Sequence, residues 1–265
     1  MNTQTQTNHT DNTESFYVVA KEPGAEHPAL PTWANRDANP AQLKQDLNNN
    51  VQRVDIDAVP GAFQLLNVLT KEECQQFINI TESLGYLPDA AVSLPRHVRH
   101  NDNVTWVADE LTIDTIWQRC QPLFTDDQNI FNGSKALGLN GRFRFYRYKK
   151  GDFFKTHTDG AWPGSRVINE QLHGDAFGDR FSQMTFLILL TEDFEGGSTQ
   201  FIINKDDPLL PAKYNGNTKI VDVRTPAGGV LCFPHGMHPL HRLHSSQEIH
   251  SGIKYIIRSD VLFEL

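Results

Sequence analysis

The sequence predicts an α+β protein whose C-terminal half is a β-sandwich or barrel. Helical periodicity is concentrated between residues 70 and 124, and short β-rich runs separated by Gly, Pro and Asp follow from residue 142 onward. Helices followed by many short strands are typical of this class. A chain of 265 residues has room for one sizeable domain or at most two small ones.

The N-terminal part of the chain is predicted to contribute little regular structure. Residues 1–15 are mostly Thr, Asn and Gln, a composition that buries too little apolar surface to fold, so we expect a dispensable disordered tail. Residues 16–50 are predicted to form an extended segment, and Glu22 to Pro40, rich in Pro, Ala and Asn, is expected to wrap the surface without regular structure. A single domain is then expected over residues 51–265.

The first regular elements are expected near Val51. Residues 51–56 and 63–69 are predicted strands. Thr70 and Glu73 form a capping box, in which each side chain satisfies a backbone N–H of the other residue, so a helix is predicted from there to Gly85.

A second helix is predicted over residues 109–124, where apolar residues recur at helical spacing. The remaining predicted strands lie in the C-terminal half and are Arg142–Tyr148, Met184–Leu190, Gln200–Ile203, Lys219–Val223, Val230–Phe233 and Ile253–Phe263.

Composition excludes several classes of protein. Lys and Arg number 24 against 32 Asp and Glu, a net charge of −8, which disfavours nucleic acid and anionic membranes as partners. No apolar run approaches the ~20 residues that span a bilayer, and residues 1–15 lack the features of a secretory signal. Cys74, Cys120 and Cys232 are too widely spaced for a disulfide framework or a CxxC metal site. A cytoplasmic setting is expected.

Histidines paired with aspartate indicate a metal site. Two His and one carboxylate on one face of the metal are typical of non-haem iron(II) oxygenases, usually as His-x-Asp with a distant second His. His-x-Asp occurs at residues 100–102, 157–159 and 173–175, and only the middle triplet follows a predicted strand through a short turn. The second His is expected from a C-terminal cluster of histidines, which consists of His235, His238, His241, His244 and His250. Within it His244 is favoured, because Lys254 follows it by ten residues.

An ordered set of spacings then resembles a known family. The set consists of Tyr148-x2-Gly151-x2-Phe154-x2-His157-x-Asp159, then Phe194-Glu195-Gly196-Gly197-x-Thr199-x-Phe201, then His244-x4-Ile249-x2-Gly252-x-Lys254-Tyr255. It resembles the prolyl 4-hydroxylase-type branch of the Fe(II)/2-oxoglutarate dioxygenases. The match covers about residues 140–265, roughly half of the chain.

This resemblance implies a double-stranded β-helix, a jelly-roll or cupin-like barrel, flanked by N-terminal helices. It implies Fe(II), 2-oxoglutarate and O2 as cofactors, with ascorbate as a candidate reductant. His157, Asp159 and His244 would ligate the iron. Lys254 would pair with the C5 carboxylate of 2-oxoglutarate and Tyr148 would help to hold it, although Arg258 lies on the same strand face and is the alternative anchor.

The same resemblance favours hydroxylation. Halogenating relatives have a small residue in place of the carboxylate ligand, whereas Asp159 is present here. We expect hydroxylation of an unactivated C–H of an amino acid, peptide or protein side chain, with proline as the first candidate and succinate and CO2 as co-products. The alternatives are a catalytically silent barrel that binds a metal or ligand and, disfavoured by the charge, a nucleic-acid repair dioxygenase.

Substrate-binding residues are expected in two segments. Residues 96–103 are dense in hydrogen-bond donors and form either a plain solvated loop or a substrate-facing segment containing Arg99, Asn101 and Asn103. The long segment between His157 and Met184, which carries Trp162, is predicted to be a lid or binding loop. Arg142 and Arg144 share strand parity with Tyr148, so they are expected to face the pocket and bind an anionic group.

Overall fold

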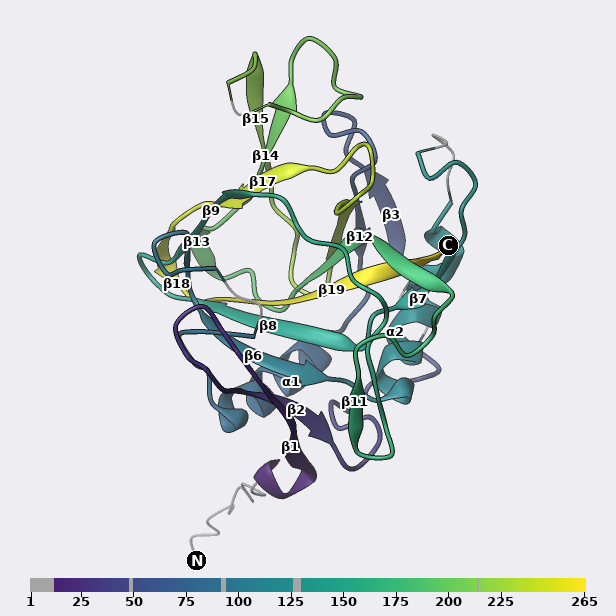
Figure 1. Ribbon diagram of the computed structural model, residues 1–265. Coiled ribbons are helices and arrows are strands. Elements are labelled where there is room, and N and C mark those ends of the chain that lie inside the picture. Colours follow the sequence, from purple (N-terminus) through teal and green to yellow (C-terminus); the bar gives the residue numbers. More distant parts are fainter. Residues whose placement is uncertain (1–11, 48–49, 92–93, 126–129, 214) are drawn as a thin grey trace, which may run out of the picture.

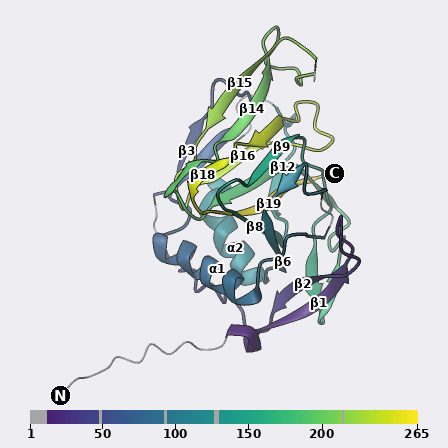
Figure 2. The ribbon, with the colours of Figure 1, turned by 90° about the vertical axis from the view of Figure 1, so that its left-hand side faces the viewer.

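Figure 1 shows the computed structural model of the protein, which describes residues 12–47, 50–91, 94–125, 130–213 and 215–265. The described chain is mostly β-sheet, with a larger and a smaller sheet packed against each other and two α-helices on the outer side of the larger one (Figures 1 and 2). No described helix is long and apolar enough to cross a membrane.

The larger sheet has ten strands among the described residues. Nine of them run in the order β1-β2-β6-β8-β19-β12-β16-β4-β3, and β7 pairs with β19 beyond the end of β8. In this order they are β1 (Phe16–Glu22), β2 (Leu30–Asn35), β6 (Asp102–Val107), β8 (Arg142–Tyr148), β19 (Lys254–Glu264), β12 (Arg180–Leu189), β16 (Val230–Pro234), β4 (Phe63–Leu66), β3 (Gln52–Asp55) and β7 (Ala136–Leu139).

The smaller sheet has five described strands in the order β15-β14-β17-β9-β5. They are β15 (Thr218–Val223), β14 (Thr199–Asn204), β17 (Leu243–Ser246), β9 (Phe153–His157) and β5 (Arg99–His100). Two short pairs stand apart from both sheets: β10 (Arg166–Ile168) with β11 (Gln171–His173), and β13 (Phe194–Gly196) with β18 (Ile249–Gly252).

Strand β8 shows how the sequence sorts its side chains between the two faces of the larger sheet. Phe143 and Phe145 are fully buried in the core beneath the helices, while Tyr146 and Tyr148 belong to the core between the sheets. Because successive side chains of a strand point to opposite faces, Arg144 shares the face of the two tyrosines. This inner face of the larger sheet carries the candidate site.

The two predicted helices are present. In α1 (Lys71–Leu84) the Thr70 hydroxyl accepts from the Glu73 N–H at 3.2 Å, and the Glu73 carboxylate accepts from the Thr70 N–H at 3.0 Å, which confirms the capping box. Helix α2 (Glu110–Cys120) is capped by Asp109 and continues into the 3-10 turn η2 (Gln121–Leu123). The predicted element at residues 109–124 is therefore a helix with a tightened last turn.

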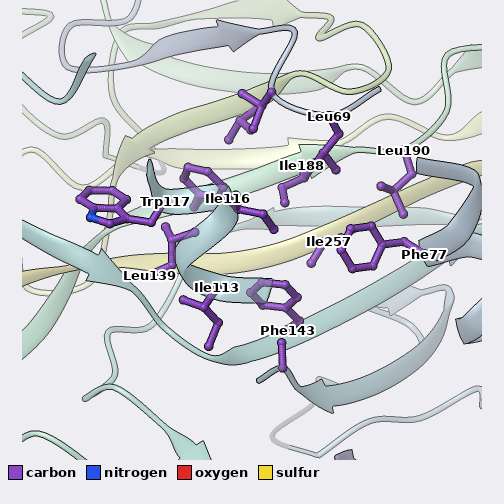
Figure 3. Packing of buried hydrophobic residues seen from close by; sticks show 14 of the residues in the cluster. Leu69, Phe77, Ile113, Ile116, Trp117, Leu139, Phe143, Ile188, Leu190 and Ile257 are labelled. Atoms are coloured by element: carbon purple, nitrogen blue, oxygen red, sulfur yellow. The ribbon is translucent and has the colours of Figure 1, made fainter. Parts of the chain in front are cut away.

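Apolar side chains of both helices fill the space against the larger sheet (Figure 3). Phe77 of α1 and Ile116 of α2 are fully buried there beside Phe143 and Ile257 of the sheet. The three cysteines are also buried in this core as free thiols, and burial raises the pKa of Cys74 and of Cys120 to about 12. The cysteines therefore pack as apolar side chains.

The expectation that residues 22–40 lack regular structure is wrong. β1 and β2 pair in an antiparallel manner, and β2 joins the larger sheet through a parallel pairing with β6. The 3-10 turn η1 (Asn12–Ser15) precedes them, so the end of the predicted tail is ordered, while residues 1–11 lie outside the described residues. Burial of Leu30 and Ala34, rather than the weak strand propensity of a run containing Pro and Asn, holds β2 in place.

The segment between His157 and Met184 is more ordered than a plain loop. It contains the β10–β11 hairpin, whose turn residues Asn169 and Glu170 have positive φ angles of 50° and 59°. Two consecutive left-handed residues are what a type I′ hairpin turn requires. Gly196, the last residue of β13, and Gly197 after it both have positive φ angles, and the chain turns there toward β14.

Candidate metal centre

His157 and His244 face each other across two paired strands. β9 and β17 are antiparallel, and their register places the two residues directly opposite, with ring centroids 4.2 Å apart. Asp159 follows two residues after His157, and its carboxylate oxygens lie 3.8 Å from His157 Nε2 and 3.7 Å from His244 Nε2. Among the described residues these three form the one group of His, Cys and acidic side chains whose ligand atoms all lie within 4.8 Å.

Backbone carbonyls orient both imidazoles. His157 Nδ1 lies 2.7 Å from the carbonyl oxygen of Lys155, and His244 Nδ1 lies 3.0 Å from that of Arg242. A carbonyl only accepts, so each Nδ1 donates a proton to it, and Nε2 is the nitrogen of each ring that is turned toward Asp159. Burial lowers the pKa of His157 to about 3, which keeps its ring neutral. Neutral imidazoles held in this way are the form that binds metal ions.

Asp159 is held as a carboxylate. Burial alone would raise its pKa, but Arg258 and the nearby histidines outweigh that effect and hold the pKa well below the usual value. Arg258 Nε lies 3.5 Å from Asp159 Oδ1, and the Thr185 hydroxyl donates to Asp159 Oδ2 at 2.6 Å. The charged form is therefore the one that a metal ion would find.

A buried hydrogen-bond chain runs behind Asp159. The Thr185 oxygen lies 2.8 Å from His235 Nδ1, His235 Nε2 lies 3.0 Å from the Ser182 hydroxyl, and that hydroxyl accepts from the Trp162 N–H at 2.8 Å. Burial lowers the pKa of His235 to about 4, so its ring is neutral, donating through Nδ1 and accepting through Nε2. Sequence reasoning missed Thr185 and Ser182, because they lie three residues apart on β12, which has a register shift between Ser182 and Met184, and they belong to no spacing motif.

Lys254 is a buried cation next to the metal centre. It is 2% exposed, and its Nζ donates to the Gly197 carbonyl at 2.6 Å and to the Ser246 hydroxyl at 3.1 Å. No carboxylate of the described residues lies within 4 Å of Nζ, and burial lowers the pKa of Lys254 to about 7. Tyr148 lies opposite Lys254 in the β8–β19 register, with its ring 5.3 Å from Nζ.

A cavity of about 40 Å³ connects the metal centre with Lys254. Its lining includes Tyr148, His157, Asp159, His244, Lys254 and Arg258. The two cations differ in their surroundings, because Arg258 also lies 3.0 Å from an Asp260 oxygen whereas Lys254 has no anionic partner in the described chain. A buried ammonium without an anion is costly, so the lysine end of the cavity suits a carboxylate.

Among the described residues, the competing His-x-Asp pairs belong to no group that could hold a metal ion. His100 Nδ1 lies 2.6 Å from Asp152, and Asp102 pairs with Arg147 at 2.8 Å, so the two residues have separate partners. His173 is exposed, and Asp175 accepts from backbone N–H groups of the turn that follows it.

The other histidines of the C-terminal cluster have different surroundings. His235 belongs to the chain behind Asp159, and His238 Nε2 lies 2.9 Å from the carbonyl of Ile130. His241 Nδ1 lies 3.1 Å from the His238 carbonyl, and His250 is exposed on β18.

The expected substrate-facing residues are buried rather than solvated. Arg99, Asn101 and Asn103 are 6%, 1% and 3% exposed, so a plain solvated loop at residues 96–103 is ruled out. The Arg99 guanidinium lies over the ring of Tyr146, 5.0 Å from its centroid. Arg144 lies over Trp162 at 5.2 Å.

Arg142 has a different partner from the one expected. It shares the strand parity of Arg144, but its Nη2 pairs with Glu22 of β1 at 2.7 Å. Its charge is therefore matched within the protein, and Arg144 is left as the arginine of β8 that is open to an anionic group. The sequence could not separate the two, because Glu22 lies 120 residues away along the chain.

Comparison with known proteins returns structural likeness alone. No protein-family model matches the sequence, and no curated protein matches it. Among solved structures, the chain is similar to a viral collagen prolyl hydroxylase from Paramecium Bursaria Chlorella virus-1 in a 2OG complex, at 15% identity and a TM-score of 0.48, covering 80% of this chain and 100% of that one. A prolyl-4-hydroxylase from Pseudomonas putida is 15% identical, with a TM-score of 0.45 and coverage of 76% of this chain and 91% of that one.

A third similar structure is a prolyl hydroxylase from Trichoplax adhaerens, solved with a peptide fragment of the hypoxia inducible factor oxygen degradation domain. It is 17% identical with a TM-score of 0.48, covering 77% of this chain and 84% of that one. These three similar proteins are all prolyl hydroxylases.

Proposed function

We propose that the protein is an Fe(II)/2-oxoglutarate-dependent dioxygenase that hydroxylates an unactivated C–H of an amino acid, a peptide or a protein side chain, in the manner of prolyl hydroxylases. The two sheets would form the double-stranded β-helix of this class. One observation carries the proposal: a converging group of two histidines and a carboxylate lies in one cavity with a buried lysine that has no anionic partner among the described residues.

The donor set fits Fe(II). Two imidazole nitrogens and one carboxylate oxygen form the 2-His-1-carboxylate set of non-haem iron oxygenases, and three protein ligands leave positions on the metal for other groups. His157, Asp159 and His244 would hold the ion, with Thr185 and Arg258 supporting Asp159 from outside. Such outer contacts fix the orientation of ligands before the metal arrives.

The lysine end of the cavity fits 2-oxoglutarate. Lys254 rather than Arg258 would bind the C5 carboxylate, because Arg258 is already matched by Asp159 and Asp260. Burial raises the pKa of Tyr148, so its hydroxyl stays protonated and is available as a donor to the same carboxylate.

Bound Fe(II) and 2-oxoglutarate, together with O2, supply the oxidant for C–H hydroxylation and yield succinate and CO2. The protein binds and orients these groups and excludes water from them. Phe154 and Phe233 do this beside the histidines, with ring centroids 3.5 Å from His157 and 4.7 Å from His244. A dry, apolar wall strengthens the charged contacts within the cavity. Ascorbate remains part of the proposal as a reductant.

The test compares His244→Ala with His250→Ala as a matched control, because His250 is an exposed histidine on the neighbouring strand β18. Wild type and His250→Ala should bind about one equivalent of Fe(II) and form succinate from 2-oxoglutarate. His244→Ala should weaken metal binding by more than the roughly 10- to 100-fold that follows loss of an outer-shell partner. Metal content and succinate are both measured.

A wild-type protein that binds Fe(II) and 2-oxoglutarate without forming succinate would instead be the silent barrel. Equal metal affinity in His244→Ala and wild type would contradict the proposed site itself.

A further inference from the structure

We propose that the substrate carries a carboxylate that is bound by Arg144, beside the metal centre. This inference rests on the proposed function and specifies its substrate class: a free amino acid, or the C-terminal residue of a peptide. Its basis is that Arg144 has no ion-pair partner in the described chain. The neighbouring cations on the same sheet face differ, because Arg142 and Arg258 pair with carboxylates and Lys254 is proposed to bind 2-oxoglutarate.

Arg144 is separated from Asp159, the proposed metal ligand, by the side chain of Arg258. It lies directly opposite Arg258 in the β8–β19 register, and Arg258 Nε is 3.5 Å from Asp159 Oδ1. From the other side, the Arg144 guanidinium carbon lies 5.2 Å from the centre of the Trp162 ring, and Trp162 follows Asp159 by three residues. A group bound to Arg144 therefore lies next to the metal centre.

Arg144 forms no ion pair with any described residue. Arg142 pairs with Glu22 at 2.7 Å, and Arg258 pairs with Asp260 at 3.0 Å. Within the described residues, Arg144 has neither a carboxylate within 4 Å nor a hydrogen bond to its guanidinium, and its Nε is buried without a partner. Leaving a buried charged donor unsatisfied is costly, so this arrangement is explained by an anion that completes it.

Trp162 fixes the place of that anion. Its backbone is tied to Ser182 by two hydrogen bonds, the N–H donating to the Ser182 hydroxyl at 2.8 Å and the carbonyl accepting from the Ser182 N–H at 2.9 Å. The backbone of Trp162 is therefore fixed, and its ring provides the surface over which the guanidinium lies. A guanidinium held in this way offers its N–H groups in the fork that matches the two oxygens of a carboxylate.

Further unsatisfied polar atoms lie on the same part of the sheet. Asn103 pairs with Tyr146 in the β6–β8 register, one diagonal step from Arg144, and its Oδ1 is buried without a partner. The neighbouring Asn101 is 1% exposed, and both polar atoms of its amide lack partners. Amide oxygens accept from N–H groups, so they suit the amino or amide nitrogen of an amino-acid substrate.

The test measures binding of a defined panel to the protein loaded with Zn(II) and 2-oxoglutarate. The panel contains the twenty standard amino acids and their N-acetyl forms, each as the free acid and as the carboxamide, and ligand-observed NMR gives the affinities. We expect at least one free acid to bind about tenfold or more tightly than its carboxamide. Binding of N-acetyl forms indicates a peptide C-terminus, and its absence indicates a free amino acid.

Two variants assign the effect to Arg144. Arg144→Gln should remove the preference for the free acid over the carboxamide. Arg144→Lys keeps the positive charge but lacks the two parallel N–H donors of a guanidinium, so it should retain part of that preference. Arg142→Gln is the matched control on the same strand and face, and it should keep the preference because Glu22 already occupies Arg142.

Equal affinity of acids and carboxamides in the wild type, no binding by any panel member, or an unchanged preference in Arg144→Gln would each overturn the inference. The wild-type comparison needs no variant to fold. Succinate formation by the wild type without added substrate tests the proposed function separately, so the two can fail independently.

Discussion

Thr185 is the residue whose contribution is most sharply defined by the structure. Its hydroxyl donates to Asp159 and lies within hydrogen-bond distance of His235, and it is 1% exposed. Thr185→Val keeps the shape of the side chain and removes the hydrogen bond. We expect Fe(II) affinity to fall about 10- to 100-fold, the usual cost of losing an outer-shell partner, as measured by metal titration.

Thr185→Ser is the control, because it keeps the hydroxyl and should bind metal nearly as well as the wild type. Equal metal affinity in the Val and Ser variants would show that the hydrogen bond does not orient Asp159.

Lys254 makes stability depend on pH in a definite direction. Burial lowers its pKa from 10.5 to about 7, so between these values the unfolded chain binds more protons than the folded one. The free energy of unfolding therefore gains a contribution that rises with pH across this window, by at most about 1.4 kcal/mol per pH unit. Lys254→Met lacks this contribution, and urea unfolding of both proteins from pH 7 to 10 should show the difference.

Lys254→Met also tests co-substrate binding. If the proposed function holds, loss of one partner of a buried charge pair should weaken 2-oxoglutarate binding by about 2–5 kcal/mol. Lys155→Met, an exposed lysine on β9, is the control and should bind normally. Unchanged 2-oxoglutarate affinity in Lys254→Met would reject Lys254 as the anchor.

At the scale of elements, the β1–β2 hairpin is part of the fold rather than an appendage. Phe16 is 5% exposed and packs edge-on against Trp106 at 5.2 Å, and Glu22 pairs with Arg142. A chain that starts at Pro23 should lose about 3–5 kcal/mol of stability from Phe16 alone. A chain that starts at Phe16 keeps these contacts and should melt close to the wild type. Thermal unfolding measures both, and equal melting of the two chains would contradict the role of β1.

The sequence predicted the parts of the site that depend on local spacing. His157 and Asp159 lie two residues apart at the end of a strand, and the ten-residue interval from His244 to Lys254 contains only the short strand β18, so both pairs could be recognised along the chain. The structure brings these residues to one cavity.

The parts that the sequence did not predict depend on distant partners. The hydrogen-bond chain behind Asp159 joins two separate regions of the sequence, with Ser182 and Thr185 in one and His235 in the other, so no fixed spacing identifies it. The ion pair of Arg142 likewise depends on Glu22, which lies in the N-terminal hairpin. The hairpin itself was missed because the rest of the sheet, rather than local propensity, stabilises β2. Tertiary pairing of this kind leaves no periodic signal in the sequence.

At the scale of the whole molecule, the order of strands in the larger sheet differs from the order of synthesis. β19 follows every other described strand along the chain, yet it lies between β8 and β12 near the middle of the sheet. Until residues 254–264 have left the ribosome, β8 and β12 each present an unpaired edge, which is a template for aggregation. Lys254 and Arg258 arrive with the same strand. The sheet and its site can therefore close only once residues 254–264 are available to pair.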